Sequence, residues 1–336
     1  MGVDLGELLN RKGIELKDMS GRWIAVDAYN TLYQFLSIIR QQDGTPLMDS
    51  SGRVTSHLSG LLYRVTSLAE NGAKLAFIFD GQPPVQKSLT LEERCNAREK
   101  AQSEWQSAIA RGEGGIKYAQ ASSRLSQEIL DDSIRLLCDM GVPVIRAPSE
   151  GEAQAAHMTR KGDAHFAASQ DYDALLFGAP RVVRNLAITG KRKLPRKNVY
   201  IDVSPEVIHL QEDLARLGIN QRQLVEIAIL CGTDYNPGVP RVGPKTAYKL
   251  IRQHGDLESA LSSLGEAIED HEDVRELFLH PKVTDEYVLK QSRPRPDQIV
   301  AFLCQERDFS EERVAKAAER LEEAYNAGQS TLDRWI

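Results

Sequence analysis

The chain has 336 residues, of which 41% are hydrophobic, so it can bury a sizeable core. Its net charge of −6 argues weakly against a nucleic-acid partner, because such proteins usually carry a basic footprint. The sequence shows no apolar run of 18 residues, no signal-peptide pattern and no C-x-x-C pair among its 4 cysteines, so we expect no membrane span and a reduced, cytosolic compartment.

The N-terminal region, residues 1–82, is predicted to fold as strand, helix, linker, helix and strand. Trp23–Val26 and Leu75–Phe79 are short apolar runs typical of buried parallel strands. Ser56–Glu70 has the apolar spacing of an amphipathic helix, and Gln41–Arg53 is a polar loop.

Two later segments are rich in basic residues. Val85–Leu125 is polar and broken by glycines, which indicates either a solvated helical excursion or a basic arch through which a flexible phosphate chain passes. Arg181–Lys197 contains basic side chains and no acid, and is predicted to form a hairpin around Thr189–Gly190. This hairpin could contact phosphate or be a solvated edge, since lysine also protects exposed strands.

The remaining elements complete an α/β fold with a central, mostly parallel sheet flanked by helices. Ser149 to Glu152 matches a capping box, with Ser149 as N-cap. Gly232–Gly243 is a predicted turn, and Lys245 follows it at a helix N-terminus that can hold a phosphate. Further strands are predicted over Val142–Ile145 and Ala164–Ser169, and helices over Ser126–Met140, Gly151–Arg160, Pro205–Leu217, Gln221–Leu230, Pro244–His254, Asp297–Leu303 and Glu311–Tyr325.

Carboxylates follow each of the four predicted strands, and one more lies in the predicted turn. In an open α/β sheet the ligand binds beyond the carboxyl ends of the strands, so these acids could converge on one crevice. Without them the chain would carry about +1 (−6 + 7). The acids are Asp27, Asp80, Glu150, Glu152, Asp171, Asp173 and Asp234.

Electrostatic repulsion indicates that such a crevice holds cations. Two carboxylates about 8 Å apart repel by roughly 2 kcal/mol at an effective dielectric of about 20. Summed over the set, this exceeds the roughly 5–15 kcal/mol that stabilises a domain, so either several acids are protonated or cations lie among them. Hard oxygen ligands select Mg²⁺ or Mn²⁺, and the number of acids predicts a two-metal site.

Lys87 and Arg94 lie two helical turns apart, shortly after Asp80. On one helix face both could point at a scissile phosphate, whereas in isolation they would be solvated cations.

The order of these motifs resembles the structure-specific 5′ nucleases, most closely the archaeal-type flap endonucleases, over nearly the whole chain. The motifs that carry the resemblance are Val26-Asp27-Ala28, Tyr33-Gln34-Phe35-Leu36, Phe79-Asp80-Gly81-Gln82-Pro83-Pro84, Ala147 to Ala153, Ser169-Gln170-Asp171-Tyr172-Asp173, Gly232-Thr233-Asp234-Tyr235 and Val242-Gly243-Pro244-Lys245.

The resemblance implies a role for each of these sites. The seven acids would hold two Mg²⁺ ions, with Mn²⁺ as a substitute, and Lys87 and Arg94 would stabilise the scissile phosphate. Tyr33 would stack on a base, Arg40 would bind DNA near the junction, and Gly2 would lie near the active site. K⁺ would bind near the turn after Asp234, although this chain has Arg241 where the family usually has glycine.

The resemblance also implies a domain organisation. Residues 1–300 would form one nuclease domain, with a helical arch over 83–125, an internal region over 126–260 and a helix–two-turn–helix element over about 221–254. A C-terminal helical region would cover 301–328, and a clamp-binding tail would cover 329–336.

The tail resembles the box that binds the sliding clamp PCNA. Leu332 and Trp335 would form an apolar plug, and Ile336 stands at the second aromatic position, which weakens the plug modestly. A disordered tail is the alternative. The four box positions are Gln329, Leu332, Trp335 and Ile336.

We therefore expect a monomeric, cytoplasmic protein of archaeal type at the replication fork, which cuts branched DNA at 5′ flaps and has 5′-3′ exonuclease activity. The alternatives are a non-catalytic, clamp-tethered DNA-binding protein and a two-metal phosphatase. Within the family, a gap nuclease or a processive exonuclease is the nearest alternative.

Overall fold

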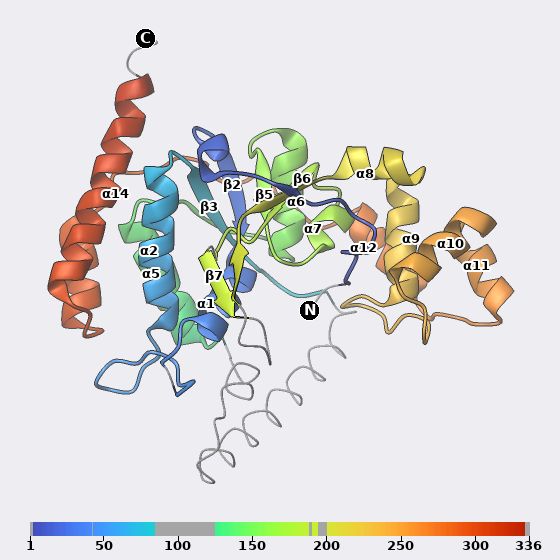
Figure 1. Ribbon diagram of the computed structural model, residues 1–336, viewed down its shortest axis with the longest axis horizontal. Coiled ribbons are helices and arrows are strands. Elements are labelled where there is room, and N and C mark those ends of the chain that lie inside the picture. The colour runs from blue at the N-terminus through green and yellow to red at the C-terminus, as the bar shows by residue number, and fades with distance from the viewer. Residues whose placement is uncertain (1–2, 42, 85–124, 188–189, 194–199, 333–336) are drawn as a thin grey trace, which may run out of the picture.

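A computed structural model describes residues 3–41, 43–84, 125–187, 190–193 and 200–332. In these residues a seven-stranded sheet is covered by helices on both faces, which confirms the predicted α/β class (Figure 1). The strands from β6 to β4 run parallel, whereas β9 pairs antiparallel with both of its neighbours. Their order is β1 (Lys12–Gly13), β9 (Glu206–His209), β6 (Arg181–Arg184), β5 (Phe166–Ala168), β2 (Trp23–Asp27), β3 (Lys74–Phe79) and β4 (Val144–Arg146).

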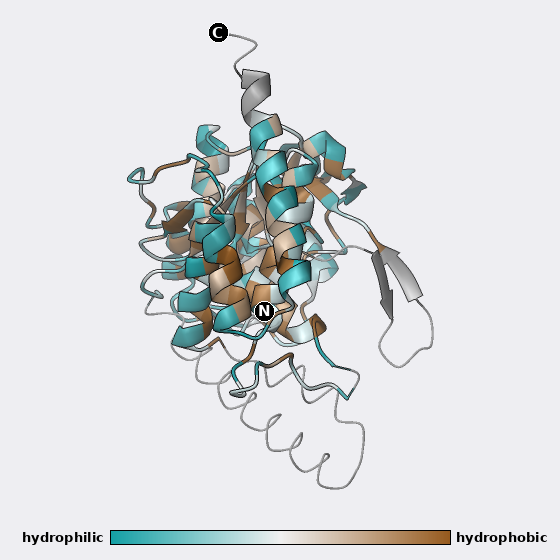
Figure 2. Cartoon of the chain, turned by 90° about the vertical axis from the view of Figure 1, so that its left-hand side faces the viewer, coloured by the Kyte–Doolittle hydropathy of each residue, from teal (hydrophilic) through white to brown (hydrophobic). Residues whose placement is uncertain are grey.

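Alternate side chains of the central strands face opposite helical layers, as the two-residue period of a strand requires. Ile24 and Val26 belong to one core cluster, and Ala25 belongs to the other. The first cluster includes buried side chains of α1 (Ala28–Ile38), α2 (Ser56–Glu70), α5 (Gln127–Asp139), α13 (Pro296–Val300), the π-helix Ala301–Gln305 and α14 (Glu311–Leu332). In Figure 2 the outward faces of these helices are mostly hydrophilic.

The second layer begins with α6 (Gly151–Lys161), whose small apolar residues pack on the sheet. It continues to the end of the molecule opposite α14 (Figure 1). Its other members are α7 (Asp173–Leu176), α8 (Leu210–Leu217), α9 (Gln221–Cys231), α10 (Pro244–His254), α11 (Leu257–Leu264) and α12 (His271–Leu279). Among the described helices, none combines the length and the apolar character needed to cross a membrane.

Two predicted elements differ from the observed ones. The predicted helix Pro205–Leu217 begins with strand β9, because its β-branched pair Val207 and Ile208 is buried against the sheet before α8 starts. The predicted hairpin over Arg181–Lys197 is wrong as well. Its first part is β6 in the main sheet, and Gly190–Lys193 (β7) pairs instead with Tyr200–Val203 (β8) in a separate ribbon.

Other boundaries shift by a few residues. The last helix runs to Leu332 rather than ending at Tyr325, so the first half of the predicted tail is helical. Its residues Val314 and Leu321 are buried in the first core cluster, so this C-terminal helix packs on the same core as α2.

Helix α6 is tied to a distant part of the chain by the side chain of Gln154. This fully buried amide donates from Nε2 to the Thr284 carbonyl at 2.8 Å, and its Oε1 accepts from the Thr284 N–H at 2.9 Å. The amide thus completes the backbone hydrogen bonding of an extended segment that has no strand partner there.

We expect Gln154→Ala to lower the free energy of unfolding by about 1–3 kcal/mol, because both Thr284 backbone groups lose their partner. Urea unfolding of the variant and of Gln127→Ala, an exposed glutamine on α5, measures this difference. Equal stability of the two variants would contradict the assignment.

Candidate active site

The predicted acids meet at the point where the order of the strands reverses. From β2 the chain proceeds outward through β3 and β4, then returns to place β5 and β6 on the other side of β2. Asp27 ends β2 and Asp171 follows β5, so these two acids flank the switch point, where open α/β sheets bind ligands.

The seven acids lie close enough together for their charges to act on the same neighbouring groups. Burial raises the pKa of Asp27 well above its usual range, and the charges of Asp80, Asp171 and Glu150 raise it further, against the opposing N–H of Asn30. Burial likewise raises the pKa of Glu152, with contributions from Asp173, Asp27 and Asp171.

The seventh acid, Asp234, acts together with other acids of the set on the phenol of Tyr235. Burial raises the pKa of its phenol, and Glu150, Asp173, Asp234 and Glu152 raise it further. The fold therefore brings the predicted acids together. Their mutual repulsion contributes to the raised pKa values of Asp27 and Glu152.

The N-terminus of α6 is held against the end of β3. The backbone N–H of Gly151 donates to Asp80 Oδ1 at 2.7 Å. The carboxylate that follows β3 therefore caps helix α6. A Cβ on Gly151 would lie 2.8 Å from the same oxygen and 3.2 Å from the Ile78 carbonyl, so only glycine permits this approach.

The predicted capping box with Ser149 as N-cap is therefore wrong. Glu150 occupies the N-cap position, and its side chain makes no capping hydrogen bond. The Ser149 carbonyl accepts from the Gly81 N–H at 2.7 Å, which ties this segment to the chain after β3. Asp80 then fills the role that the local pattern gave to serine.

Of the four predicted DNA-binding residues, three lie in described parts of the chain. Tyr33 is half-buried in α1. Arg40 donates from Nη1 to the Gly44 carbonyl at 2.8 Å, and burial lowers its pKa, so its guanidinium braces the adjoining loop. Lys245 is exposed on α10, and its Nζ lies 3.4 Å from Glu7.

Of the remaining predicted residues, two lie in a described helix and five lie outside the described chain. Gln329 and Leu332 belong to the last turns of α14. Gly2, Lys87, Arg94, Trp335 and Ile336 lie outside the described residues.

The turn between α9 and α10 keeps a glycine-like backbone at a non-glycine position. Arg241 has φ of +67°, in the left-handed region, and its side chain is exposed. A left-handed conformation at a residue with a side chain costs local strain, so this turn holds Arg241 in a position that glycine would occupy without that cost.

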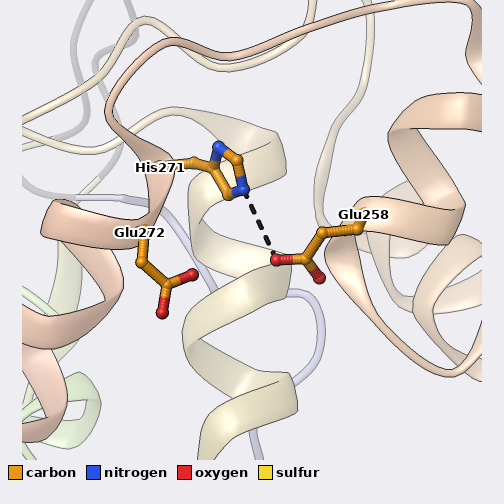
Figure 3. Close-up of side chains that lie close together, drawn as sticks. All are labelled: Glu258, His271 and Glu272. Atoms are coloured by element: carbon orange, nitrogen blue, oxygen red, sulfur yellow. Dashed lines mark ion pairs between the residues drawn. The ribbon is translucent and has the colours of Figure 1, made fainter.

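A compact group of possible metal ligands lies elsewhere, on α11 and α12. Ligand atoms of Glu258, His271 and Glu272 lie within 4.8 Å of one another (Figure 3). Both acids also pair with the buried guanidinium of Arg275, which lies 2.9 Å from Glu272 and 3.5 Å from Glu226. The group is thus an ion-pair network that joins these helices.

Comparison with known proteins assigns the family. Residues 1–101 match the XPG N-terminal domain, and residues 141–234 match the XPG I-region. Flap endonuclease 1 of Methanothrix thermoacetophila is 64% identical over 336 residues, which is 100% of both chains. The chain belongs to the flap endonuclease 1 family.

Solved structures agree with this assignment. The flap endonuclease-1 structure from Methanococcus jannaschii matches with a TM-score of 0.77 and 39% identity, over 96% of this chain and 98% of that one. The catalytic core of Rad2 in complex with DNA shares the fold, with a TM-score of 0.70 and 21% identity over 93% and 96% of the chains. This flap endonuclease is therefore a DNA phosphodiester hydrolase of the structure-specific 5′ nucleases, a family that acts in replication and repair.

The acidic cluster of this flap endonuclease has the oxygen ligands that a hard divalent cation needs. Oε1 of Glu152 is buried and has no hydrogen-bond partner among the described residues, so it is available as a ligand. Among the described residues, no three of the seven carboxylates offer oxygens within 4.8 Å of one another.

Several residues that support the acids escape sequence reasoning. Arg184, in the basic stretch predicted either to contact phosphate or to be a solvated edge, donates from Nε to the Gln170 carbonyl at 3.0 Å and stacks on Tyr172, with 4.3 Å between guanidinium and ring. Arg181 donates to the His165 carbonyl at 2.8 Å. Both arginines brace the fold, a role that basic composition does not reveal.

We expect Gly151→Ala to reduce flap cleavage by about 10²-fold, because the new methyl group displaces the Asp80 carboxylate. Single-turnover cleavage measures the effect, and thermal unfolding should show little change, since alanine favours helix formation. Gly328→Ala is the matched control, because a Cβ there meets nothing within 4 Å. Full activity in Gly151→Ala would show that this close approach is dispensable.

Proposed function

We propose that this flap endonuclease hydrolyses one phosphodiester at the junction of single- and double-stranded DNA, with a two-metal site built from the seven acids. The observation that carries the proposal is the proximity of these acids, which come from β2, the ends of β3 and β5, the N-terminus of α6 and the turn after α9, near one switch point of the sheet. The fold relative GEN1, with a TM-score of 0.56 and 16% identity over 90% of this chain and 70% of that one, was crystallised with product DNA and Mg²⁺.

Asp27, Asp80, Glu150, Glu152, Asp171, Asp173 and Asp234 would hold the ions, directly or through water. Two bound Mg²⁺ ions supply activation of a water molecule and stabilisation of charge on the leaving 3′ oxygen. The carboxylates must be deprotonated to bind them, so cation binding opposes the raised pKa values of Asp27 and Glu152.

Other parts of the chain would guide the DNA. Lys87 and Arg94, in a helical arch, would neutralise charge on the scissile phosphate, and Tyr33 would stack on a base next to it. Arg40 and Gly2 would act near the junction. These contacts are to backbone and shape, so we expect little dependence on base sequence.

The helix–two-turn–helix element would bind the uncleaved strand. It comprises α9, the turn that follows and α10, where Lys245 is exposed next to backbone N–H groups of a helix N-terminus. K⁺ held in this turn would supply positive charge for the phosphate backbone, and the exposed Arg241 would offer a direct phosphate contact.

The test is cleavage of a labelled double-flap DNA, with a 5′ flap and a one-nucleotide 3′ flap. We expect one cut at the junction with Mg²⁺ or Mn²⁺, none with EDTA, and none in Asp171→Ala, because that variant lacks a ligand at the switch point. Asp273→Ala, an exposed acid on α12, is the matched control and should cleave normally. Unchanged cleavage in Asp171→Ala would refute the assignment of the site.

We also propose that the C-terminal residues 329–336 bind the sliding clamp PCNA of an archaeal replication fork, where the enzyme acts as a cytoplasmic monomer. The support is the sequence box Gln329, Leu332, Trp335 and Ile336, of which the first two residues lie in the last turns of α14.

Calorimetric titration with an archaeal clamp tests this partner. We expect Trp335→Ala to weaken binding by about 30-fold or more, as loss of an aromatic anchor in a pocket typically costs about 2 kcal/mol. Asp333→Ala changes a tail position outside the box and should bind normally. Equal affinities of the two variants would exclude the box as the docking element.

A further inference from the structure

Asn30, in the first turn of α1, contacts acids from both sides of the switch point. Its backbone N–H donates to Asp27 Oδ1 at 3.0 Å, and its side-chain Nδ2 donates to Asp171 Oδ2 at 3.0 Å. Asp27 ends β2, and Asp171 follows β5. One residue therefore spans the crevice and fixes one oxygen on each side of it.

The orientation of the Asn30 amide is fixed by two donors. Its Oδ1 accepts from Gln34 Nε2 at 2.6 Å and from the backbone N–H of Gln170 at 3.1 Å. A flipped amide would place its NH₂ group against both donors, so the NH₂ group must face Asp171. The side chain can then act only as a donor to that carboxylate.

The loop that carries Asp171 is also held from its other side. Ser169 Oγ accepts from the Asp171 N–H at 3.2 Å, and Arg184 donates to the Gln170 carbonyl at 3.0 Å. With the loop backbone anchored in this way, the remaining freedom of Asp171 lies in its side-chain torsions. The bond from Asn30 restricts those torsions.

Asparagine suits this position on chemical grounds. Its amide donates to a carboxylate without adding positive charge, so the crevice keeps its attraction for cations. An aspartate here would add a carboxylate to a site that already repels itself, and a lysine would compete with the ions for Asp171.

We propose that Asn30 is a positioning residue that sets the separation of Asp27 and Asp171 for divalent-ion binding. This inference rests on the proposed two-metal function. Hydrogen-bond partners of metal ligands typically contribute about 10- to 100-fold to metal affinity. We therefore expect Asn30→Ala to weaken Mn²⁺ binding by that factor.

The experiment measures free Mn²⁺ by electron paramagnetic resonance during titration of the full-length protein without DNA. Asn30→Ala is compared with Gln34→Met, which keeps Asn30 but removes one donor that orients it and should give a smaller loss of affinity in the same direction. Asn71→Ala is the matched control, because Asn71 is exposed and its side chain bonds only the Ser67 carbonyl among the contacts of the described chain.

Flap cleavage supplies a second readout. In Asn30→Ala, excess Mg²⁺ should restore much of kcat, while KM for DNA stays unchanged, because the variant alters ion binding rather than the DNA path. A lower unfolding temperature with unchanged Mn²⁺ affinity in both Asn30→Ala and Gln34→Met would overturn the inference and leave Asn30 a purely structural role.

The two proposals can fail separately. If the wild-type protein binds no Mn²⁺ and cuts no flap, the two-metal function is overturned and the role of Asn30 with it. If the wild-type protein binds Mn²⁺ and cuts, but Asn30→Ala has the same affinity, only the role of Asn30 is overturned.

Discussion

Repulsion among the acids of the crevice is the constraint on which the rest of the structure depends. Burial and like charge both raise the pKa of Asp27 and of Glu152, so the crevice costs stability wherever its acids are ionised without cations. The chain limits this cost with fixed N–H donors, from Asn30 and from the helix N-terminus at Gly151. These donors stabilise carboxylates without neutralising the site.

Precise placement of the acids requires support from distant parts of the sequence. Helix α6 carries Glu150 and Glu152 at its start and Gln154 shortly after, so the bonds from Gln154 to Thr284 help to hold the same turn that presents the acids. Arg184 holds the loop of Asp171 in the same manner. Residues remote from the chemistry therefore decide where the carboxylates lie, because a rigid support is needed to hold like charges together.

The parts of the fold that could be predicted from the sequence were those set by the local spacing of apolar residues. Buried strands that end in acids are visible because a short apolar run and its flanking carboxylate are adjacent in the chain, and Ser56–Glu70 shows helical spacing over its whole length. Tertiary contacts decided the rest. Asp80 replaced Ser149 as the cap, and the bond from Asn30 to Asp171 joins residues 141 positions apart, so no local pattern contains it.

Net charge misleads for the same reason. A value of −6 argued against nucleic acid, yet the acids responsible are gathered in one crevice, and two divalent cations there would bring the total to −2 (−6 + 4). Arg181 and Arg184 donate to backbone carbonyls and so support the fold, which a count of basic residues cannot distinguish from surface available to DNA. What matters for a DNA-binding enzyme is therefore where charge lies: acids enclosed with their cations, and exposed cations such as Lys245 at a helix N-terminus that can meet the phosphate backbone.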